Sequence, residues 1–150
     1  MEQVAIAQRD PVIEFTVILG GEDNWLSQFI HMLSMHGNFV LGLMSQRFLG
    51  YSVVRFVTES PQDVRELLRV QGINFSESTV VVVHLRGLDQ LDNVSRTLVN
   101  NEVLLHHCYG LLSLNNEGYR IVLRVDNDAM AIGVLTKSGF EVLSPSDLCR

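Results

Sequence analysis

The side chains with the clearest potential for chemistry are three consecutive residues, His106, His107 and Cys108. They fall in a predicted strand, where His106 and Cys108 share one face and His107 points to the other. At most two of them can meet at one metal ion, whereas a closed zinc site needs four ligands. We therefore expect no metal site, and interpret the triplet as two surface or interface histidines and a small buried thiol.

The sequence also lacks the usual motifs of a catalytic nucleophile or a phosphate-binding loop. Neither cysteine belongs to a Cys-X-X-Cys pair, and no Gly-X-Ser-X-Gly segment occurs. Gly20-Gly21 is predicted to be a turn, because the spaced third glycine of a dinucleotide-binding loop is missing. We therefore expect neither an enzyme nor a cofactor.

Composition narrows the class of protein further. The 150 residues are 47% hydrophobic and 19% charged, so the chain can bury enough apolar surface to fold. Its net charge is −6 and its basic residues form no cluster, which argues against a nucleic-acid partner. No apolar run is long enough to span a membrane, and the first residues do not resemble a signal peptide. Two cysteines suit a reducing compartment, so we expect a cytoplasmic protein.

The elements predicted to position any site occur in the same order twice. In the first pass, Asp23 or Asn24 can cap a helix that carries Leu26, Phe29, Ile30 and Leu33 on one face, and Gly37 ends it. Pro61 begins the second helix and Gly72 ends it. The strands of this pass are predicted at 12–19, 39–48, 51–58 and 73–77. The second pass has strands at 79–85, 103–114, 119–126 and 140–144 and helices at 90–101 and 128–138.

Matching residues at constant spacing indicate that the second pass is a duplicate of the first. Leu26, Leu33, Phe39 and Met44 lie 65 positions before Leu91, Leu98, Leu104 and Tyr109. With a hairpin three residues longer in the second copy, Gly50-Tyr51 and Val53-Val54 correspond to Gly118-Tyr119 and Ile121-Val122. Gly72 corresponds to Gly139.

Both passes have the order β-α-β-β-α-β, which predicts an α+β, ferredoxin-like fold repeated twice. Each copy would form a four-stranded antiparallel sheet with both helices on one face. We expect the two domains at residues 12–77 and 78–148. Residues 80–83 and 39–41 are apolar on both faces of their strands, which is typical of strands buried on both sides. We therefore expect the copies to pair into a larger sheet and the chain to form a homodimer.

The repeated segments resemble ACT domains, which are small amino-acid-binding regulatory modules that usually work in pairs. The spacing of Leu26, Leu33, Gly37 and Phe39, and that of Leu91, Leu98, Leu104 and Tyr109, carries the resemblance. The stretches LLRVQGINF and LTKSGFEVL also match the second helix and last strand of that family. The resemblance covers residues 12–148 as two tandem copies without a catalytic domain.

The resemblance implies a regulatory protein that binds a small molecule, such as an amino acid, where two copies meet. The ligand would contact the loop between the first strand and first helix, and the start of the second strand. In this sequence those positions are Glu22, Asp23, Asn24, Trp25, Leu26, Asn38, Phe39 and Val40 in the first copy, and Leu88, Asp89, Gln90 and Leu91 in the second. The regulated partner would be an enzyme or a transcription factor.

Elementary chemistry is consistent with such a site. N–H groups at a helix N-terminus bind a carboxylate, and C=O groups at a strand start can accept from an ammonium. Glu22 and Asp23 can add to an ammonium site, or only favour the helix dipole. Trp25 can stack on a ligand or partner, or cover the core.

Two other hypotheses remain open. The family usually has a Pro-Gly pair before the helix, but Asn24 and Asp89 stand at the glycine position here. The chain could therefore be a degenerate pair that binds no ligand and serves as a protein-interaction or dimerisation module. The other hypothesis is an acyl-CoA-dependent N-acetyltransferase-like fragment. The segment VLTKSGFEVL resembles the last helix and strand of those enzymes, although the sequence has no glycine-rich pyrophosphate loop.

Overall fold

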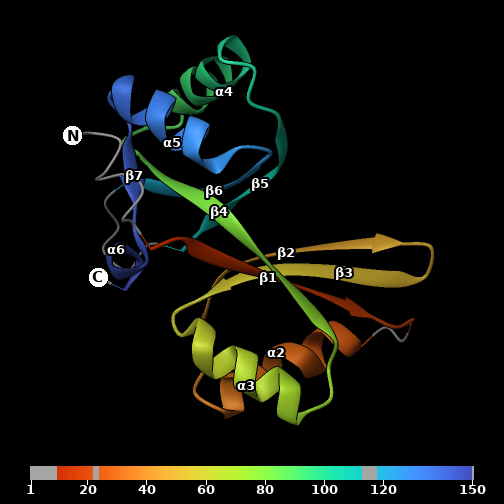
Figure 1. Cartoon of the computed structure of the whole chain (residues 1–150). Coiled ribbons are helices and arrows are strands. Elements are labelled where there is room, and N and C mark those ends of the chain that lie inside the picture. The colour runs from red at the N-terminus through yellow and green to blue at the C-terminus, as the bar shows by residue number, and fades with distance from the viewer. Residues whose placement is uncertain (1–9, 22–23, 113–117, 150) are drawn as a thin grey trace. The chain divides into compact units, whose positions relative to one another are not determined.

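The computed structural model describes residues 10–21, 24–112 and 118–149. The chain divides into two compact units, which we call the first unit (residues 13–78) and the second unit (residues 79–149 together with 10–12). In each unit, the two longer helices gather on one side of that unit's strands (Figure 1). No helix among the described residues is long and apolar enough to cross a membrane.

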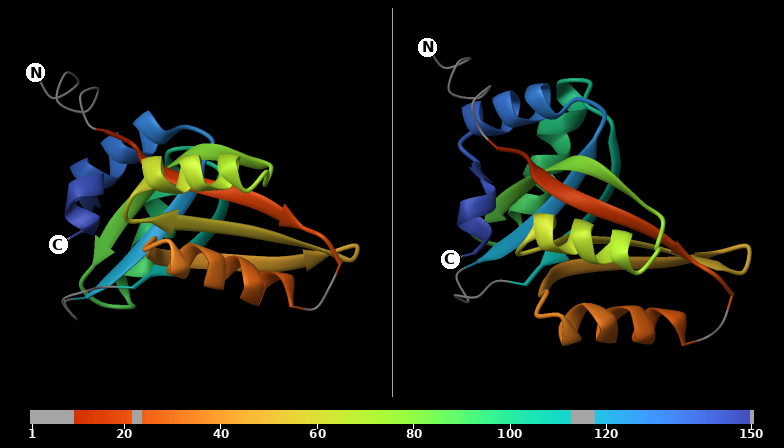
Figure 2. Two further views of the ribbon diagram at one scale, coloured as in Figure 1. Left: turned by 90° about the horizontal axis from the view of Figure 1, so that it is seen from below. Right: turned by 60° about the horizontal axis from the view of Figure 1, so that its bottom comes forward.

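The first unit has the strand order β2-β3-β1-β4. Strands β1 and β2 both pair with β3 in antiparallel fashion. Helices α2 and α3 lie in front of these strands when the unit is seen from below (Figure 2, left). The elements are β1 (Val12–Leu19), α2 (Trp25–Met35), β2 (Val40–Phe48), β3 (Tyr51–Thr58), α3 (Pro61–Val70) and the beginning of β4 (Phe75–Leu85).

The second unit repeats this arrangement, with the strand order β7-β4-β6-β5 and antiparallel pairing throughout. Its elements are the rest of β4, α4 (Gln90–Asn100), β5 (Leu105–Leu111), β6 (Tyr119–Val125), α5 (Asp128–Lys137), β7 (Glu141–Leu143) and α6 (Pro145–Leu148). Both units are therefore α+β and ferredoxin-like, as the sequence predicts.

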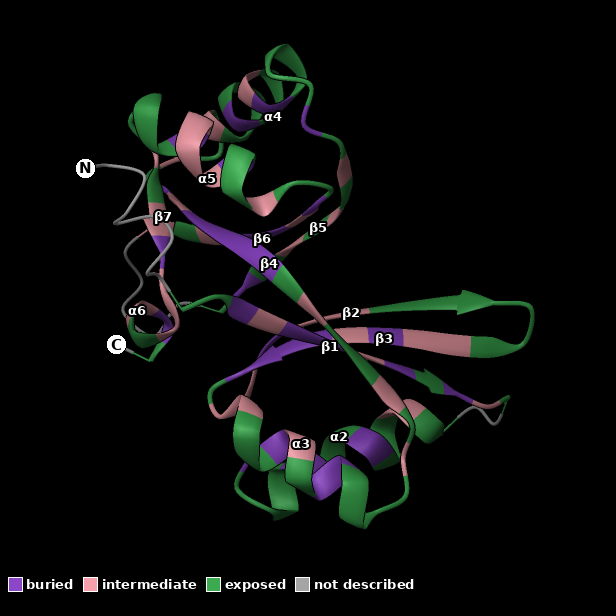
Figure 3. Ribbon diagram, in the orientation of Figure 1, coloured by how far each residue is buried: buried purple, intermediate pink, exposed green. Residues whose placement is uncertain are grey.

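Each unit has its own hydrophobic core between sheet and helices. In the first unit, the ring of Phe56 lies 5.5 Å from those of Phe15 and Phe29, measured between centroids. The second unit has no such ring cluster in its described core, where Val, Leu and Ala fill the space around Leu98 and Leu135. Along the helices, buried residues alternate with exposed ones (Figure 3), which is the pattern of amphipathic helices.

Helices α2, α3, α4 and α5 all end in the same backbone motif. The residue after the C-cap has a positive φ, and the next N–H bonds back to a carbonyl five residues earlier. In α2 this bond joins Asn38 N to Leu33 O at 3.0 Å, and in α4 it joins Val103 N to Leu98 O at 2.9 Å. Gly37, Gly72 and Gly139 supply the positive φ in three cases. In α4, Glu102 adopts it instead, with φ 58°.

The first hairpin is a two-residue turn in which Leu49 and Gly50 both have positive φ, as a type I′ turn requires. The strand register corrects our alignment beyond it. Leu43 pairs with Phe56, whereas Cys108, 65 positions after Leu43, pairs with Leu123, which lies 67 positions after Phe56. The second hairpin is therefore two residues longer, not three, and matching Gly50 to Gly118 is wrong. A shift of one residue in a strand exchanges its two faces.

Three other expectations about the elements need correction. The strands expected at 73–77 and 79–85 are one continuous strand, β4. Asn24 occupies the N-cap position of α2, but its side chain makes no capping hydrogen bond. Ile30 was expected on the inner face of α2, yet its side chain is exposed. The structure also adds the short helix α6, which Ser144 and Asp147 begin with a capping box.

Candidate functional site

The expected ligand loop of the first unit connects β1 to α2. Its residues Glu22 and Asp23 lie outside the described residues. Gly21 lies against the β2–β3 turn, because a Cβ at this position would be only 3.1 Å from the carbonyl oxygen of Gly50. This end of the loop is therefore held close to the hairpin.

The N-terminus of α2 is where the sequence predicts that a ligand carboxylate would bind. The Asn24 side chain accepts no capping hydrogen bond from the backbone, and the first turn of the helix contains no acidic residue. The partial positive charge of this helix end therefore favours a carboxylate. Trp25 is 41% exposed beside it, while Leu26 is half-buried and packs against the core. Trp25 does not fully cover the core, so its ring is accessible from solvent.

The other expected residues of the first copy lie at the opposite end of α2. An 11-residue helix is about 16 Å long, so this distance separates Trp25 from Asn38, Phe39 and Val40. Asn38 is 7% exposed, whereas Phe39 is 64% exposed. The carbonyl oxygen of Phe39 already accepts a hydrogen bond from the N–H of Glu59 at 3.2 Å. One copy alone cannot bring both ends of α2 to a small ligand.

The expected loop of the second unit has different electrostatics. Asp89 stands at the N-cap of α4 without capping it, and Asp92 adds a second carboxylate in the first turn. The Asp89 carboxylate folds over Gly87, where a Cβ would lie 2.5 Å from its oxygen. Leu88 and Leu91 are both exposed. Two acidic side chains at this helix end repel an anionic ligand group.

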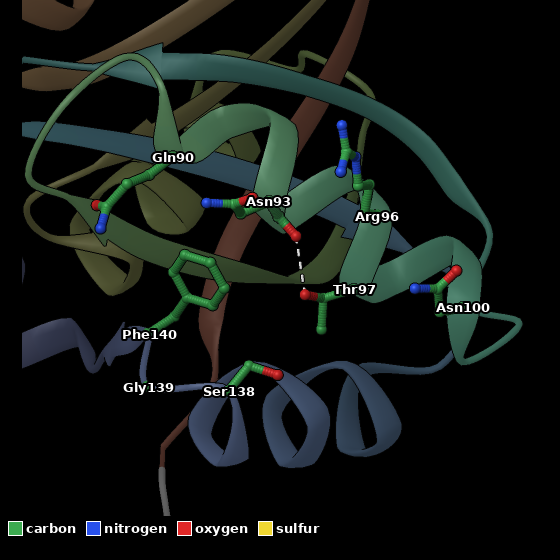
Figure 4. A pocket seen from close by; sticks show the side chains of 8 residues that line it. All are labelled: Gln90, Asn93, Arg96, Thr97, Asn100, Ser138, Gly139 and Phe140. Atoms are coloured by element: carbon green, nitrogen blue, oxygen red, sulfur yellow. Dashed lines mark hydrogen bonds between the residues drawn. The ribbon is translucent and has the colours of Figure 1, made fainter.

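Gln90, one of the expected residues of the second loop, lines a cavity in its own unit. The backbone N–H of Arg86 donates to Gln90 Oε1 at 2.7 Å. The cavity is a groove of about 360 Å³ beside α4 (Figure 4). It is lined by Gln90, Asn93, Arg96, Thr97 and Asn100 from α4, and by Ser138, Gly139 and Phe140 after α5.

Sequence reasoning missed the other residues of this groove. Asn93, Thr97 and Asn100 recur at spacings of four and three, which places them on one side of a helix. A polar stripe at helical spacing is also the ordinary solvent face of a helix, so the sequence alone gave no reason to select it. The groove forms only when folding places Ser138 and Phe140 beside α4.

In the His106–Cys108 triplet, His107 pairs with Arg124 and Cys108 with Leu123, so these two side chains lie on opposite faces of β5. The strand register shifts at His106, so the regular alternation expected there is interrupted. His107 stacks on Tyr109, with 6.2 Å between ring centroids. Cys108 was expected to be buried, but it is exposed. Within the described ranges, no three His, Cys, Asp or Glu side chains are grouped so that they could hold a metal ion.

No protein-family model matches the sequence, and no curated protein matches it. Solved structures do resemble it. Protein BT0572 from Bacteroides thetaiotaomicron superposes with a TM-score of 0.83 at 19% identity, over 92% of this chain and 95% of that chain. The regulatory subunit of aspartate kinase from Thermus thermophilus, in its ligand-free form, has a TM-score of 0.61 at 10% identity, over 88% and 95%.

A structure of aspartokinase alpha and beta subunits is also similar, with a TM-score of 0.54 at 14% identity, over 87% of this chain and 97% of that chain. At such low identities the likeness establishes the fold alone. The chain thus shares its fold, along most of its length, with proteins that include an aspartate kinase regulatory subunit.

Proposed function

We propose that this chain is a non-catalytic regulatory protein of two ACT-like domains. It binds an amino acid and responds by changing how its domains or its subunits pair. The observation that carries the proposal is the likeness to an aspartate kinase regulatory subunit, which the match covers almost completely. A ligand that binds only the paired state shifts the pairing equilibrium by its differential affinity.

The N-terminus of α2 is the favoured place for the amino-acid carboxylate. It has no acidic residue in its first turn, whereas α4 carries Asp92 there and Asp89 at its N-cap. Asn38, Phe39 and Val40 lie about 16 Å away at the other end of α2, so a second copy must supply them to the same ligand. Binding and pairing are coupled for this reason.

The direct test is a thermal-shift screen of the full chain against the twenty amino acids, followed by sedimentation with any ligand that stabilises it. Asn24→Asp gives α2 the N-cap residue of α4 and should weaken binding about tenfold by repelling the carboxylate. The matched control, Asp89→Asn, should leave binding unchanged. A chain that no amino acid stabilises, or an equal response in both variants, would contradict the proposal.

The second candidate is a dimerisation module that binds no ligand. It is favoured by apolar side chains on one face of the first unit's sheet near the hairpin, where Ile18 pairs with Val53 and Phe48 pairs with Tyr51. Ile18, Phe48 and Tyr51 are 66%, 65% and 55% exposed. If dimers persist without any ligand and Phe48→Ser dissociates them, the dimerisation module is favoured over the amino-acid-binding regulator. The acetyltransferase hypothesis gains no support from the similar structures.

A further inference from the structure

We propose that the groove beside α4 binds a neutral, hydroxyl-rich small molecule, of which a monosaccharide is the simplest example. The groove belongs entirely to the second unit and is separate from the amino-acid site proposed at α2. Its volume of about 360 Å³ is within the range of small-molecule sites.

The groove is polar without carrying free charge. Its lining includes the amides of Gln90, Asn93 and Asn100 but no carboxylate. Arg96, the one cation of the lining, pairs with Asp92 at 2.9 Å and points away from Phe140 and Ser138 (Figure 4). An amide both donates and accepts hydrogen bonds, as a hydroxyl does. The lining therefore matches hydroxyl groups better than an ion.

Two half-buried side chains in the groove are already oriented. Gln90 Oε1 accepts from the N–H of Arg86 at 2.7 Å, which leaves the NH₂ group of the same amide as a donor. The Thr97 hydroxyl donates to Asn93 O at 2.8 Å, which leaves its oxygen as an acceptor. Groups that are fixed before binding lose less conformational entropy when a ligand arrives.

Phe140 supplies an apolar wall to the groove. Its ring lies between Gln90 and Ser138 (Figure 4) and is only half-buried. Its backbone is fixed by the bond from Phe140 N to Leu135 O at 3.0 Å. A sugar ring has an apolar C–H face as well as hydroxyls, so it can use this wall and the amides at once.

The fold itself does not require polar side chains here. The first unit has the same helix ends, and three of its matching positions carry Trp25, Met32 and Met35 in place of Gln90, Thr97 and Asn100. The positions that match Asn93, Arg96 and Ser138 carry the polar residues Gln28, His31 and Gln71. The same backbone thus tolerates large apolar side chains. The polar character of Gln90, Thr97 and Asn100 is therefore specific to the second unit, whereas the other polar positions of the lining are polar in both units.

Saturation-transfer NMR of the full chain with glucose, galactose, mannose and ribose tests the proposal. We expect at least one sugar to bind with a Kd on the order of 1 mM. Thr97→Val removes the acceptor with little change in volume and should weaken binding about fivefold, as the loss of one hydrogen bond predicts. Thr136→Val, on the exposed side of α5 outside the groove, should leave binding unchanged.

Asn100→Ala provides a second variant if Thr97→Val does not fold, because Asn100 is exposed and its loss cannot open the core. It should also weaken sugar binding several-fold. No saturation transfer from any of the four sugars would overturn the proposal, as would equal binding by the groove variants and Thr136→Val. The two proposals can fail independently. If amino acids stabilise Asn100→Ala as they do the wild type but stabilise Asn24→Asp less, the amino-acid site at α2 is supported whatever the result with sugars.

Discussion

The two units share a backbone plan but differ in the chemistry that the plan presents. Both have antiparallel sheets of the same strand order, and both end their longer helices with the same motif. At the start of the first helix, however, α2 has no acidic residue where α4 has Asp92. Both units retain the buried core positions and the C-terminal helix motif. They differ at the N-terminus of the first helix and in the surface grooves, where a ligand could bind.

The largest expected effect on stability is at the buried core positions that both units retain. Leu33 and Leu98 occupy matching buried positions, 0% and 1% exposed. Leu33→Ala and Leu98→Ala should each lower the free energy of unfolding by about 2–5 kcal/mol, because each leaves a cavity in its core. Urea denaturation of the full chain measures this.

The controls are Met35→Ala and Val99→Ala, on the same helices but 70% and 69% exposed. They should change stability by less than about 0.5 kcal/mol. If one leucine variant behaves like its control, the two cores are not equivalent and the comparison fails at that position.

A smaller effect on stability, opposite in sign between the units, is expected at the C-terminal ends of α2 and α4, where the residue with positive φ differs. Gly37 and Glu102 both have positive φ. Gly37→Ala should destabilise the protein by about 1 kcal/mol, since a Cβ there meets open space and only backbone strain is added. Glu102→Gly should stabilise it by up to about 1 kcal/mol, because it removes that strain. Thermal unfolding resolves both signs.

Gly133→Ala separates strain from a general effect of glycine replacement. Gly133 lies inside α5 without a positive φ, and a Cβ there also meets open space. This variant should be more stable by about 0.5–1 kcal/mol. If Gly37→Ala is stabilising as well, the left-handed conformation at Gly37 does not decide the cost.

The smallest expected effect is an ion pair that only the first unit has. Arg65 Nε donates to Glu77 Oε2 at 2.9 Å, and this hydrogen bonding lowers the pKa of Glu77 below its ordinary 4.5. The matching positions of the second unit are Ile132 and Ser144. Glu77→Gln should cost about 0.5 kcal/mol at pH 7, as expected for a pair at the surface.

The pH dependence follows from the direction of the shift. A carboxylate with a lowered folded pKa stabilises the protein above its unfolded pKa, and this contribution is lost as the pH falls through the folded pKa. The difference between wild type and Glu77→Gln should therefore shrink as the pH drops below about 4.5.

Most of the fold could be predicted from the sequence because helix and strand periods are local signals. Gly37, Gly72 and Gly139 were correctly predicted at helix ends, since few other residues adopt a positive φ without strain. The register after the hairpin could not be predicted from Gly50 and Gly118. It is fixed by which face of each strand meets the helices, as the pairing of Cys108 with the buried Leu123 shows.

The expected site could be predicted only in part. Asn24 and Asp89 were correctly predicted at helix starts. Whether their side chains form capping hydrogen bonds depends on the local backbone geometry, which residue types alone do not determine. Thr97 and Phe140 come from segments far apart in the sequence, so their shared groove exists only after folding. A sequence motif for ligand binding can record only the part of a site that lies in one segment.

Strand β4 has a consequence for anyone who wants to separate the two units. It runs from Phe75 to Leu85, and the boundary between the units, after Ser78, falls inside it. A cut there leaves the first unit with a stub of its last strand and the second with a shortened first strand, in which Val80–Val83 are buried. Clones of single units should overlap across residues 75–85, because no surplus linker is available for division.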